Sequence, residues 1–341
     1  MRKRFFPYAW GDWVAMAAVV AVILNFANTA SSQHGPEVRT GCASQHYRIV
    51  PLPLRPYHVN DQTAVAGVTA DHRAASWTEK GGPHVFELPT GFHHAEAIDI
   101  NNAGHVLVTA ASADGAKRAS FLAVDGPLQP IRGENARANA INTRGELAGE
   151  AKFPGQGGTG PAWWRSAEPT SLGACCGGRA IALNDRGDVV GEAYDKQGQY
   201  RAFAWNQKAG LALIGPEDAY STAVAVNDFG HVVVYAFTTG SWFYRDGKST
   251  KMDLSKRWPS QPRALNGCDV VVGSFGANSD ESEAFVWDEK EGFRNLNDLV
   301  AKNTGWKLEV ASSVNERGEI AGWGDHGGDE DAGFLLIPEK P

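Results

Sequence analysis

A short segment built around asparagine recurs seven times along this chain of 341 residues, at intervals of 39 residues (Asn227 to Asn266) to 49 residues (Asn266 to Asn315). The seven asparagines are Asn60, Asn101, Asn142, Asn184, Asn227, Asn266 and Asn315. In every copy an apolar residue precedes the asparagine. A period of about 40 residues indicates one supersecondary unit repeated around an axis or along a solenoid.

The first half of each unit has the pattern of a β-hairpin. In the copy at 180–191, an apolar run precedes Asn184, Gly187 follows three positions later, and a second apolar run comes next. Asparagine at the first position and glycine at the fourth fit a type I turn. Short apolar runs on both sides of a turn predict a hairpin. Two copies carry Thr63 and Asp269 in place of the glycine. We therefore interpret the asparagine as a turn residue.

An aromatic strand and a short last strand complete each unit, as in Tyr200–Trp205 and Lys251–Leu254. Four short strands, here named a to d in chain order, within about 40 residues have the size of one propeller blade. Tryptophans recur on strand c, which predicts packing between blades rather than an exposed sugar-binding platform. They are Trp77, Trp163, Trp164, Trp205 and Trp287.

The two ends of the repeat region complement each other. After Asn315 the chain has room for strands a, b and c only, whereas Tyr47–Leu52 forms a single strand before the first asparagine. Pairing these ends would close a ring and remove two exposed sheet edges. We therefore predict an all-β fold, a seven-bladed β-propeller with four-stranded blades over residues 46–337, whose last blade is closed by the N-terminal strand. Residues 338–341 are expected to form a tail.

The repeat resembles that of the HAF-repeat family of bacterial extracellular proteins. The resemblance lies in an apolar-Asn-x-x-Gly segment followed by an Ala-Phe-x-Trp segment, best seen at 180–191 with 202–205 and at 265–273 with 284–287. It covers about residues 46–337. The histidine that names the family is absent from every copy, where arginine, proline, glycine, glutamate or alanine stands instead. The resemblance implies a repeat architecture and export, and it implies no activity.

Residues 1–30 have the pattern of a signal peptide or a membrane anchor. Met1–Arg4 is basic, Trp13–Phe26 is apolar apart from one asparagine, and small residues follow at Ala30–Ser32. An apolar stretch of about fourteen residues fits a signal peptide and is short for a membrane span. A periplasmic or extracellular location follows from a cleaved signal, and an anchor in the inner membrane from an uncleaved one. Residues 31–45 are polar and are expected to form a linker.

The charge and the motifs restrict the function. A formal net charge of −7 disfavours a nucleic-acid partner, and contact with a membrane is expected only through an uncleaved N-terminal segment. No Ser-His-Asp, Cys-His or phosphate-loop pattern can be assembled. We expect a monomeric binding or scaffold module that presents rim loops to an envelope or extracellular protein or glycan. The alternative is a metal-dependent enzyme with its site on the same rim.

The b–c and d–a loops of a propeller share one rim, and here they carry acidic and histidine side chains. We expect this rim to contact a partner through Trp258, Asp280, Glu281, Asp325, His326, Asp329 and Asp331. Carboxylates suit Ca²⁺, and carboxylates with histidine suit another divalent metal such as Zn²⁺. Candidate metal ligands are Asp71, His72, His93, His94, Asp325, His326 and Asp329. The alternative interpretation is a solvated acidic surface. His105 and His231, just after turn glycines, are expected to be exposed.

The four cysteines allow three disulfide pairings, and an exported chain permits them. Cys175 and Cys176 are adjacent, and a bridge between them would be strained. Cys268 lies in an a–b turn of the sixth unit, and Cys42 precedes the closing strand of the seventh. The closing strand starts on the same rim as Cys268, and the two blades are neighbours. Cys42 with Cys268 is therefore the pairing that the predicted geometry allows.

Overall fold

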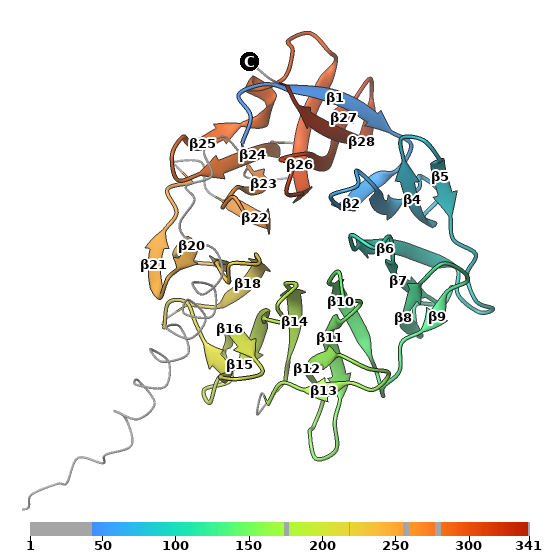
Figure 1. Ribbon diagram of the computed structural model, residues 1–341, viewed down its shortest axis with the longest axis vertical. Helices are drawn as coiled ribbons and strands as arrows, with labels where there is room; N and C mark the ends of the chain where they lie inside the picture. The colour runs from blue at the N-terminus through green and yellow to red at the C-terminus, as the bar shows by residue number, and fades with distance from the viewer. Residues whose placement is uncertain (1–42, 174–176, 218, 255–258, 277–280, 340–341) are drawn as a thin grey trace, which may run out of the picture.

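The computed structural model describes residues 43–173, 177–217, 219–254, 259–276 and 281–339. Seven antiparallel sheets of four strands each surround a central axis (Figure 1). The predicted seven-bladed β-propeller is therefore confirmed. Blades are numbered here in chain order, and strand a of each lies nearest the axis.

Blades 1 to 3 pair neighbouring strands of the chain in order. They consist of β2 (Arg55–Val59), β3 (Val65–Val68), β4 (Ala74–Thr78), β5 (Gly82–Val85), β6 (His94–Ile100), β7 (Val106–Ala111), β8 (Arg118–Ala123), β9 (Gln129–Pro130), β10 (Arg137–Ile141), β11 (Leu147–Lys152), β12 (Thr159–Trp164) and β13 (Thr170–Ser171).

Blades 4 to 6 repeat this order, and a 3-10 turn, η1 (Leu296–Asp298), follows blade 6. Their strands are β14 (Gly178–Leu183), β15 (Val189–Tyr194), β16 (Tyr200–Asn206), β17 (Gly210–Leu213), β18 (Ser221–Val226), β19 (Val232–Ala236), β20 (Gly240–Arg245), β21 (Lys248–Lys251), β22 (Ser260–Leu265), β23 (Val271–Phe275), β24 (Glu283–Asp288) and β25 (Gly292–Asn295).

Blade 7 is assembled from both ends of the described chain. It consists of β26 (Trp306–Val314), β27 (Ile320–His326), β28 (Asp329–Pro338) and β1 (Tyr47–Leu52). β1 pairs antiparallel with β28, from Tyr47 opposite Pro338 to Leu52 opposite Gly333, and the two lie side by side in Figure 1. The N-terminal strand thus takes the place of strand d, as predicted from the single strand that precedes the first asparagine in the sequence.

The a–b hairpins turn as the asparagine repeat predicted. In all seven the asparagine carbonyl accepts a hydrogen bond from the main-chain N–H three residues later, at 2.9–3.1 Å. That later residue has a positive φ in every copy, including Thr63 and Asp269, both at 61°. The turn therefore imposes the left-handed conformation even where glycine is replaced.

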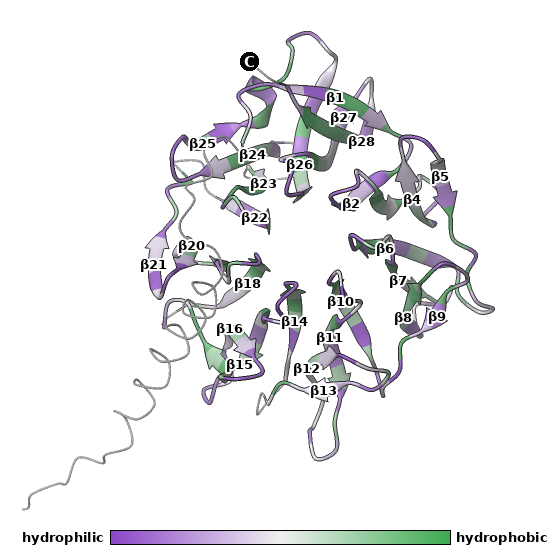
Figure 2. Cartoon of the chain, in the orientation of Figure 1, coloured by the Kyte–Doolittle hydropathy of each residue, from purple (hydrophilic) through white to green (hydrophobic). Residues whose placement is uncertain are grey.

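The hydrophobic core consists of layers between neighbouring blades. Trp163 of blade 3 packs on Trp205 of blade 4 with ring centroids 5.2 Å apart, and Phe243 of blade 5 packs on Trp287 of blade 6 at 5.9 Å. Figure 2 shows apolar strands inside the blades and polar turns at their ends. Burial of each such ring stabilises the fold by roughly 1.5–3 kcal/mol. The strand-c tryptophans are therefore core residues, with Trp77 only half-buried.

One sequence interpretation is corrected in blade 7. The acidic segment from Asp325 to Asp331 was expected to be a b–c loop, but β27 and β28 extend the hairpin to a two-residue turn. Gly327 and Gly328 form it with φ of 66° and 90°. Two consecutive positive φ values suit a tight hairpin turn, and two glycines adopt them without a Cβ clash. The acidic side chains therefore lie along strands rather than in an open loop.

Within the described ranges, no helix is both long and apolar enough to cross a membrane. Residues 1–42 lie outside those ranges. The signal peptide or anchor and most of the linker fall there, so export and cleavage remain predictions.

Candidate functional site

The seven repeat asparagines form a closed hydrogen-bonded ring around the axis. The side-chain amide of each one donates to the main-chain carbonyl of the asparagine in the next blade, and Asn315 donates back to Asn60. The seven distances, in order from Asn60, are 2.8, 2.9, 3.1, 2.8, 3.0, 3.0 and 2.9 Å. Neighbouring blades are thus joined at the axis by one side-chain bond each.

The oxygen of each asparagine amide is used within its own turn. In blade 4, Asn184 Oδ1 accepts from the N–H of Arg186 at 3.0 Å and of Asp188 at 2.9 Å. All seven asparagines are buried, so they satisfy donors and acceptors that would otherwise be unpaired. The turn interpretation accounts for the oxygen but missed the role of the amide N–H. The signal was that asparagine, and never aspartate or serine, stands in all seven copies.

Three turns add a buried carboxylate four residues after the asparagine. These are Glu146, Asp188 and Glu319, and each pairs with an arginine two residues earlier, Arg144, Arg186 or Arg317. Each carboxylate also accepts from the amide of its own asparagine at 2.7–2.8 Å. Buried charges are tolerated only with such partners.

Two of these turns border a cavity between blades 3 and 4. It has a volume of about 370 Å³ and lies on the rim of the a–b and c–d turns, called here the a–b rim. Its lining residues are Arg144, Glu146, Trp163, Arg165, Arg186, Gly187, Asp188, Asn206, Gln207 and Lys208. The rim of the b–c and d–a loops is called here the b–c rim. The cavity lies on the opposite rim, and sequence reasoning did not find it.

Five of the seven predicted partner residues of the b–c rim lie in the part of the chain that the structure describes. Trp258 and Asp280 lie outside the described residues. Asp331 pairs with Arg55 at 2.9 Å. His326 stacks on Trp306 at 4.4 Å.

The remaining acidic residues of this rim are exposed or near turns. Asp325 Oδ1 accepts from the N–H of Gly328 at 3.2 Å, and Asp329 Oδ1 accepts from the N–H of Asp331 at 3.2 Å. Glu281 is exposed before β24. These contacts stabilise the hairpin end.

The seven candidate metal ligands are not brought together. Asp71 accepts a hydrogen bond from the Thr69 hydroxyl, which lowers its pKa, and His72, His93 and His94 are exposed. In the part of the chain that the structure describes, no group of three or more His, Cys, Asp or Glu side chains could hold a metal ion. Binding of Ca²⁺ or another divalent metal remains a prediction without support from this geometry.

His231 corrects another expectation. Its side chain is only 14% exposed, and its Nδ1 lies 2.6 Å from Asp269 Oδ1 in the next blade. Asp269 replaces the turn glycine of blade 6 and also accepts from the Asn227 amide at 2.9 Å. The departure from glycine thus supplies an inter-blade contact.

An exposed aromatic pair lies on the b–c rim of blade 5. Tyr220, before β18, is 51% exposed and Phe237, after β19, is 56% exposed. The N–H of Phe237 donates to the Tyr220 carbonyl at 3.0 Å, so the two are cross-strand neighbours. The ring of Tyr235 lies 5.0 Å from that of Phe237. Sequence reasoning missed this patch, because neither residue belongs to the repeat.

Cys268 takes part in a disulfide. The other three cysteines, including Cys42, lie outside the described residues, so the pairing of Cys42 with Cys268 remains a prediction. Ala43 packs on the same core cluster as Cys268, which is consistent with it.

Comparisons with known proteins identify the fold and no family. No protein-family model matches the sequence, and no curated protein matches it. The chain is similar to YCF48 bound to D1 peptide, at 11% identity and a TM-score of 0.55, over 88% of this chain and 99% of that one. It is similar to virginiamycin B lyase from Staphylococcus aureus, at 11% identity and a TM-score of 0.50, over 86% of this chain and 100% of that one. It is also similar to acylaminoacyl peptidase from Pyrococcus horikoshii, at 11% identity and a TM-score of 0.51, over 86% of this chain and 51% of that one.

These neighbours include a peptide-bound protein and enzymes, and at this identity they share only the fold. The chain is a β-propeller, a class in which function depends on the rims rather than on the scaffold.

Proposed function

We propose that this propeller is an exported binding module that presents its b–c rim to a protein partner in the cell envelope or outside the cell. The observation that carries the proposal is the exposed pair Tyr220 and Phe237. Solvent exposure of two adjacent large apolar side chains is unfavourable, and aromatic residues are enriched at the centres of protein interfaces.

A protein fits this surface better than a glycan does. The pair lies beside Tyr235 on a strand end, and its apolar area needs an apolar counterpart. The enzyme alternative gains no comparable support. The resemblance to HAF-repeat proteins and the N-terminal segment favour export.

Site-specific photo-crosslinking tests the proposed surface. A benzophenone amino acid at position 237 should crosslink to a defined envelope protein in cells, whereas the same group at Val124 should not. Val124 is a matched control because it is 45% exposed and lies after β8, in the c–d turn on the opposite rim. Tyr220→Ser should reduce the yield at position 237. Equal crosslinking at both positions, or none at 237, would refute the proposal. Binding of the parent protein to an envelope glycan that is lost in Tyr220→Ser, with no protein crosslink at position 237, would assign the surface to sugars.

Export needs its own test. Residues 1–45 fused to a reporter that is active only outside the cytoplasm should give signal in a bacterial host. A silent fusion, with stable protein detected by immunoblot, would contradict export without bearing on the crosslinking result.

A further inference from the structure

The cavity between blades 3 and 4 is cationic although the whole protein is acidic. Four cationic side chains line it, Arg144, Arg165, Arg186 and Lys208, against two carboxylates, while the formal net charge of the chain is −7. Its volume of about 370 Å³ falls at the small end of ligand pockets.

Both carboxylates of the cavity are already paired with an arginine and an asparagine amide. Glu146 accepts from Asn142 and pairs with Arg144, and Asp188 accepts from Asn184 and pairs with Arg186. They neutralise two of the four cations. Arg165 is 64% exposed and its Nε lies 3.8 Å from Glu146 Oε1, and Lys208 is exposed. The mouth of the cavity therefore keeps an excess of positive charge.

Two hydrogen-bond donors in the cavity wall have no acceptor. These are Trp163 Nε1 and Arg186 Nη1, both buried and unpartnered within the described residues. Trp163 is only 6% exposed. Native proteins rarely leave buried donors unpaired, and such groups call for an explanation. Because both are donors, what they lack is an acceptor.

A glycine keeps space open between the Arg144 guanidinium group and the Trp163 ring. A Cβ on Gly187 would lie 3.2 Å from Arg144 Nη2 and 3.9 Å from Trp163 Cζ2. Any larger residue would therefore fill the gap between the guanidinium group and the indole ring. Gly187 is also the turn glycine with φ of 86°, so one residue serves both the turn and the cavity.

We propose that this cavity binds an oxyanion, a carboxylate, sulfate or phosphate group of a small ligand. Trp163 Nε1 and Arg186 would donate to its oxygens, and Arg165 and Lys208 would attract it from solvent. Charge-assisted hydrogen bonds from guanidinium groups are the strong kind for such ligands. The site lies on the a–b rim and does not depend on the function proposed for the b–c rim.

Calorimetric titration of the purified propeller tests the site. Sodium phosphate, sodium sulfate and sodium succinate serve as probes at constant ionic strength, with sodium chloride as the reference. We expect saturable binding of at least one probe, weakened at least tenfold by Arg165→Gln with Lys208→Gln. Preference for succinate would indicate a ligand with a carboxylate group. Preference for phosphate or sulfate would indicate a phosphate or sulfate ester.

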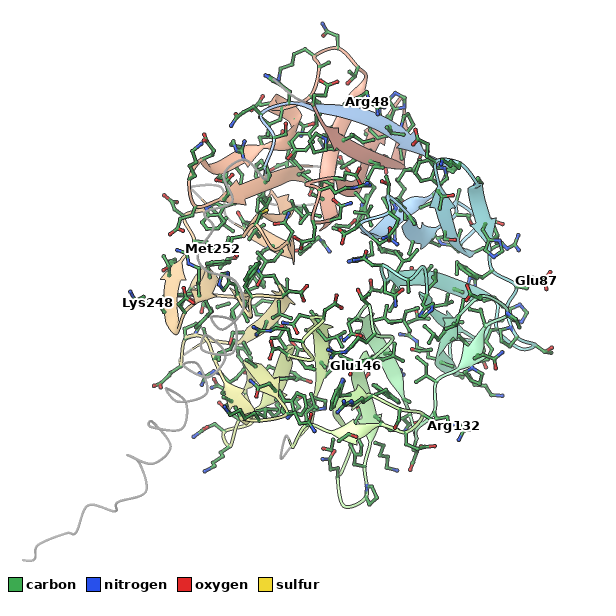
Figure 3. All side chains as sticks on the ribbon, in the orientation of Figure 1. Arg48, Glu87, Arg132, Glu146, Lys248 and Met252 are labelled. Atoms are coloured by element: carbon green, nitrogen blue, oxygen red, sulfur yellow. The ribbon has the colours of Figure 1, made fainter. Side chains whose placement is uncertain are left out.

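A matched variant controls for the loss of charge. Lys248 and Lys251 are exposed on β21, and Figure 3 shows Lys248 at the outer edge of blade 5, away from Glu146 near the axis. Their double change to glutamine removes the same charge elsewhere and should leave binding unchanged. Trp163→Phe keeps an aromatic ring beside Trp205 but is smaller and lacks the N–H, so it should weaken binding of the probe.

The outcomes separate the site from general charge effects. No saturable binding of any probe overturns the proposal, as does an equal loss in the two double variants. If Trp163→Phe fails to fold, the double variant Arg165→Gln with Lys208→Gln tests the site by itself, because neither residue is buried.

Discussion

The side-chain amide of Asn315 donates a 2.9 Å hydrogen bond to the main-chain carbonyl of Asn60, which lies 255 residues earlier in the chain. This bond closes the axial ring that the other six asparagines build. The outer closure is separate, because β1 pairs with β28 at the far edge of the same blade. The propeller is therefore closed twice, once by a side chain at the axis and once by a strand at the perimeter.

Aspartate in the ring should destabilise the fold to a degree that depends on the blade. Asn60→Asp loses the inter-blade donor and should lower the free energy of unfolding by about 2 kcal/mol. Asn142 donates to both the Asn184 carbonyl and the Glu146 carboxylate, so Asn142→Asp also brings two carboxylates together. We expect a loss of about 4 kcal/mol there. Urea unfolding at pH 7 measures both values, and equal losses would contradict the role assigned to the buried acid.

The architecture could be predicted because its signals are local and repeated. The asparagine period gave the blade count, and the unpaired segment Tyr47–Leu52 gave the closure, which coincides with β1. The ring bonds could not be predicted in the same way, since a type I turn already explains asparagine within each copy. Only the stacking of blades places one amide beside the next carbonyl.

The cavity was hidden from sequence reasoning for a related reason. Trp163 is the penultimate residue of β12 in blade 3, and Arg186 belongs to the first turn of blade 4. Trp163 follows the core pattern of its strand, and Arg186 follows a common turn pattern. Nothing in either segment indicates that their donors lie in one cavity wall without an acceptor. The acidic segment of blade 7 attracted attention instead, because charge density is visible in a sequence and unpaired donors are not.

Removal of the closing strand should be far more damaging than removal of the segment before it. Deletion of Tyr47–Leu52 leaves the edge of β28 unpaired and uncovers Leu335 and Leu336, which are buried on opposite faces of that strand. We expect aggregation, or a melting temperature lower by about 10 °C or more. Deletion of residues 31–41, which keeps Cys42, should change it by less than about 2 °C. Similar melting temperatures for the two truncations would exclude closure by β1.

The disulfide of Cys268 should involve Cys42. Peptide mapping under non-reducing conditions should recover that pair and not a link to Cys175 or Cys176. Cys268→Ser should lower the free energy of unfolding by about 2–4 kcal/mol in oxidising buffer. The variant and the parent protein should have the same stability once both are reduced. A link to Cys175 or Cys176 would contradict the pairing, and a difference that persists after reduction would assign the effect to packing.

His58 and Asp99 should make stability depend on pH between neighbouring blades. Burial by itself would lower the pKa of His58, but the Asp99 carboxylate 3.0 Å away outweighs it, and the pKa lies above the ordinary value of 6.5. The protonated ring is thus favoured in the folded state. Its contribution is fully present below pH 6.5 and is lost as the pH rises through the folded pKa.

An NMR titration of the His58 ring protons measures this directly. The midpoint should lie above 6.5 in the parent protein and should fall in Asp99→Asn, because the amide removes the charge. Asp99 also accepts from the N–H groups of Ile100 and Ile141 at 2.8 Å, so this variant should lose stability at every pH. His58→Gln leaves Asp99 in place and separates the two effects: its melting temperature should vary less between pH 6 and pH 8 than that of the parent. An unchanged midpoint in Asp99→Asn, or an undiminished pH dependence in His58→Gln, would show that the pair does not control this titration.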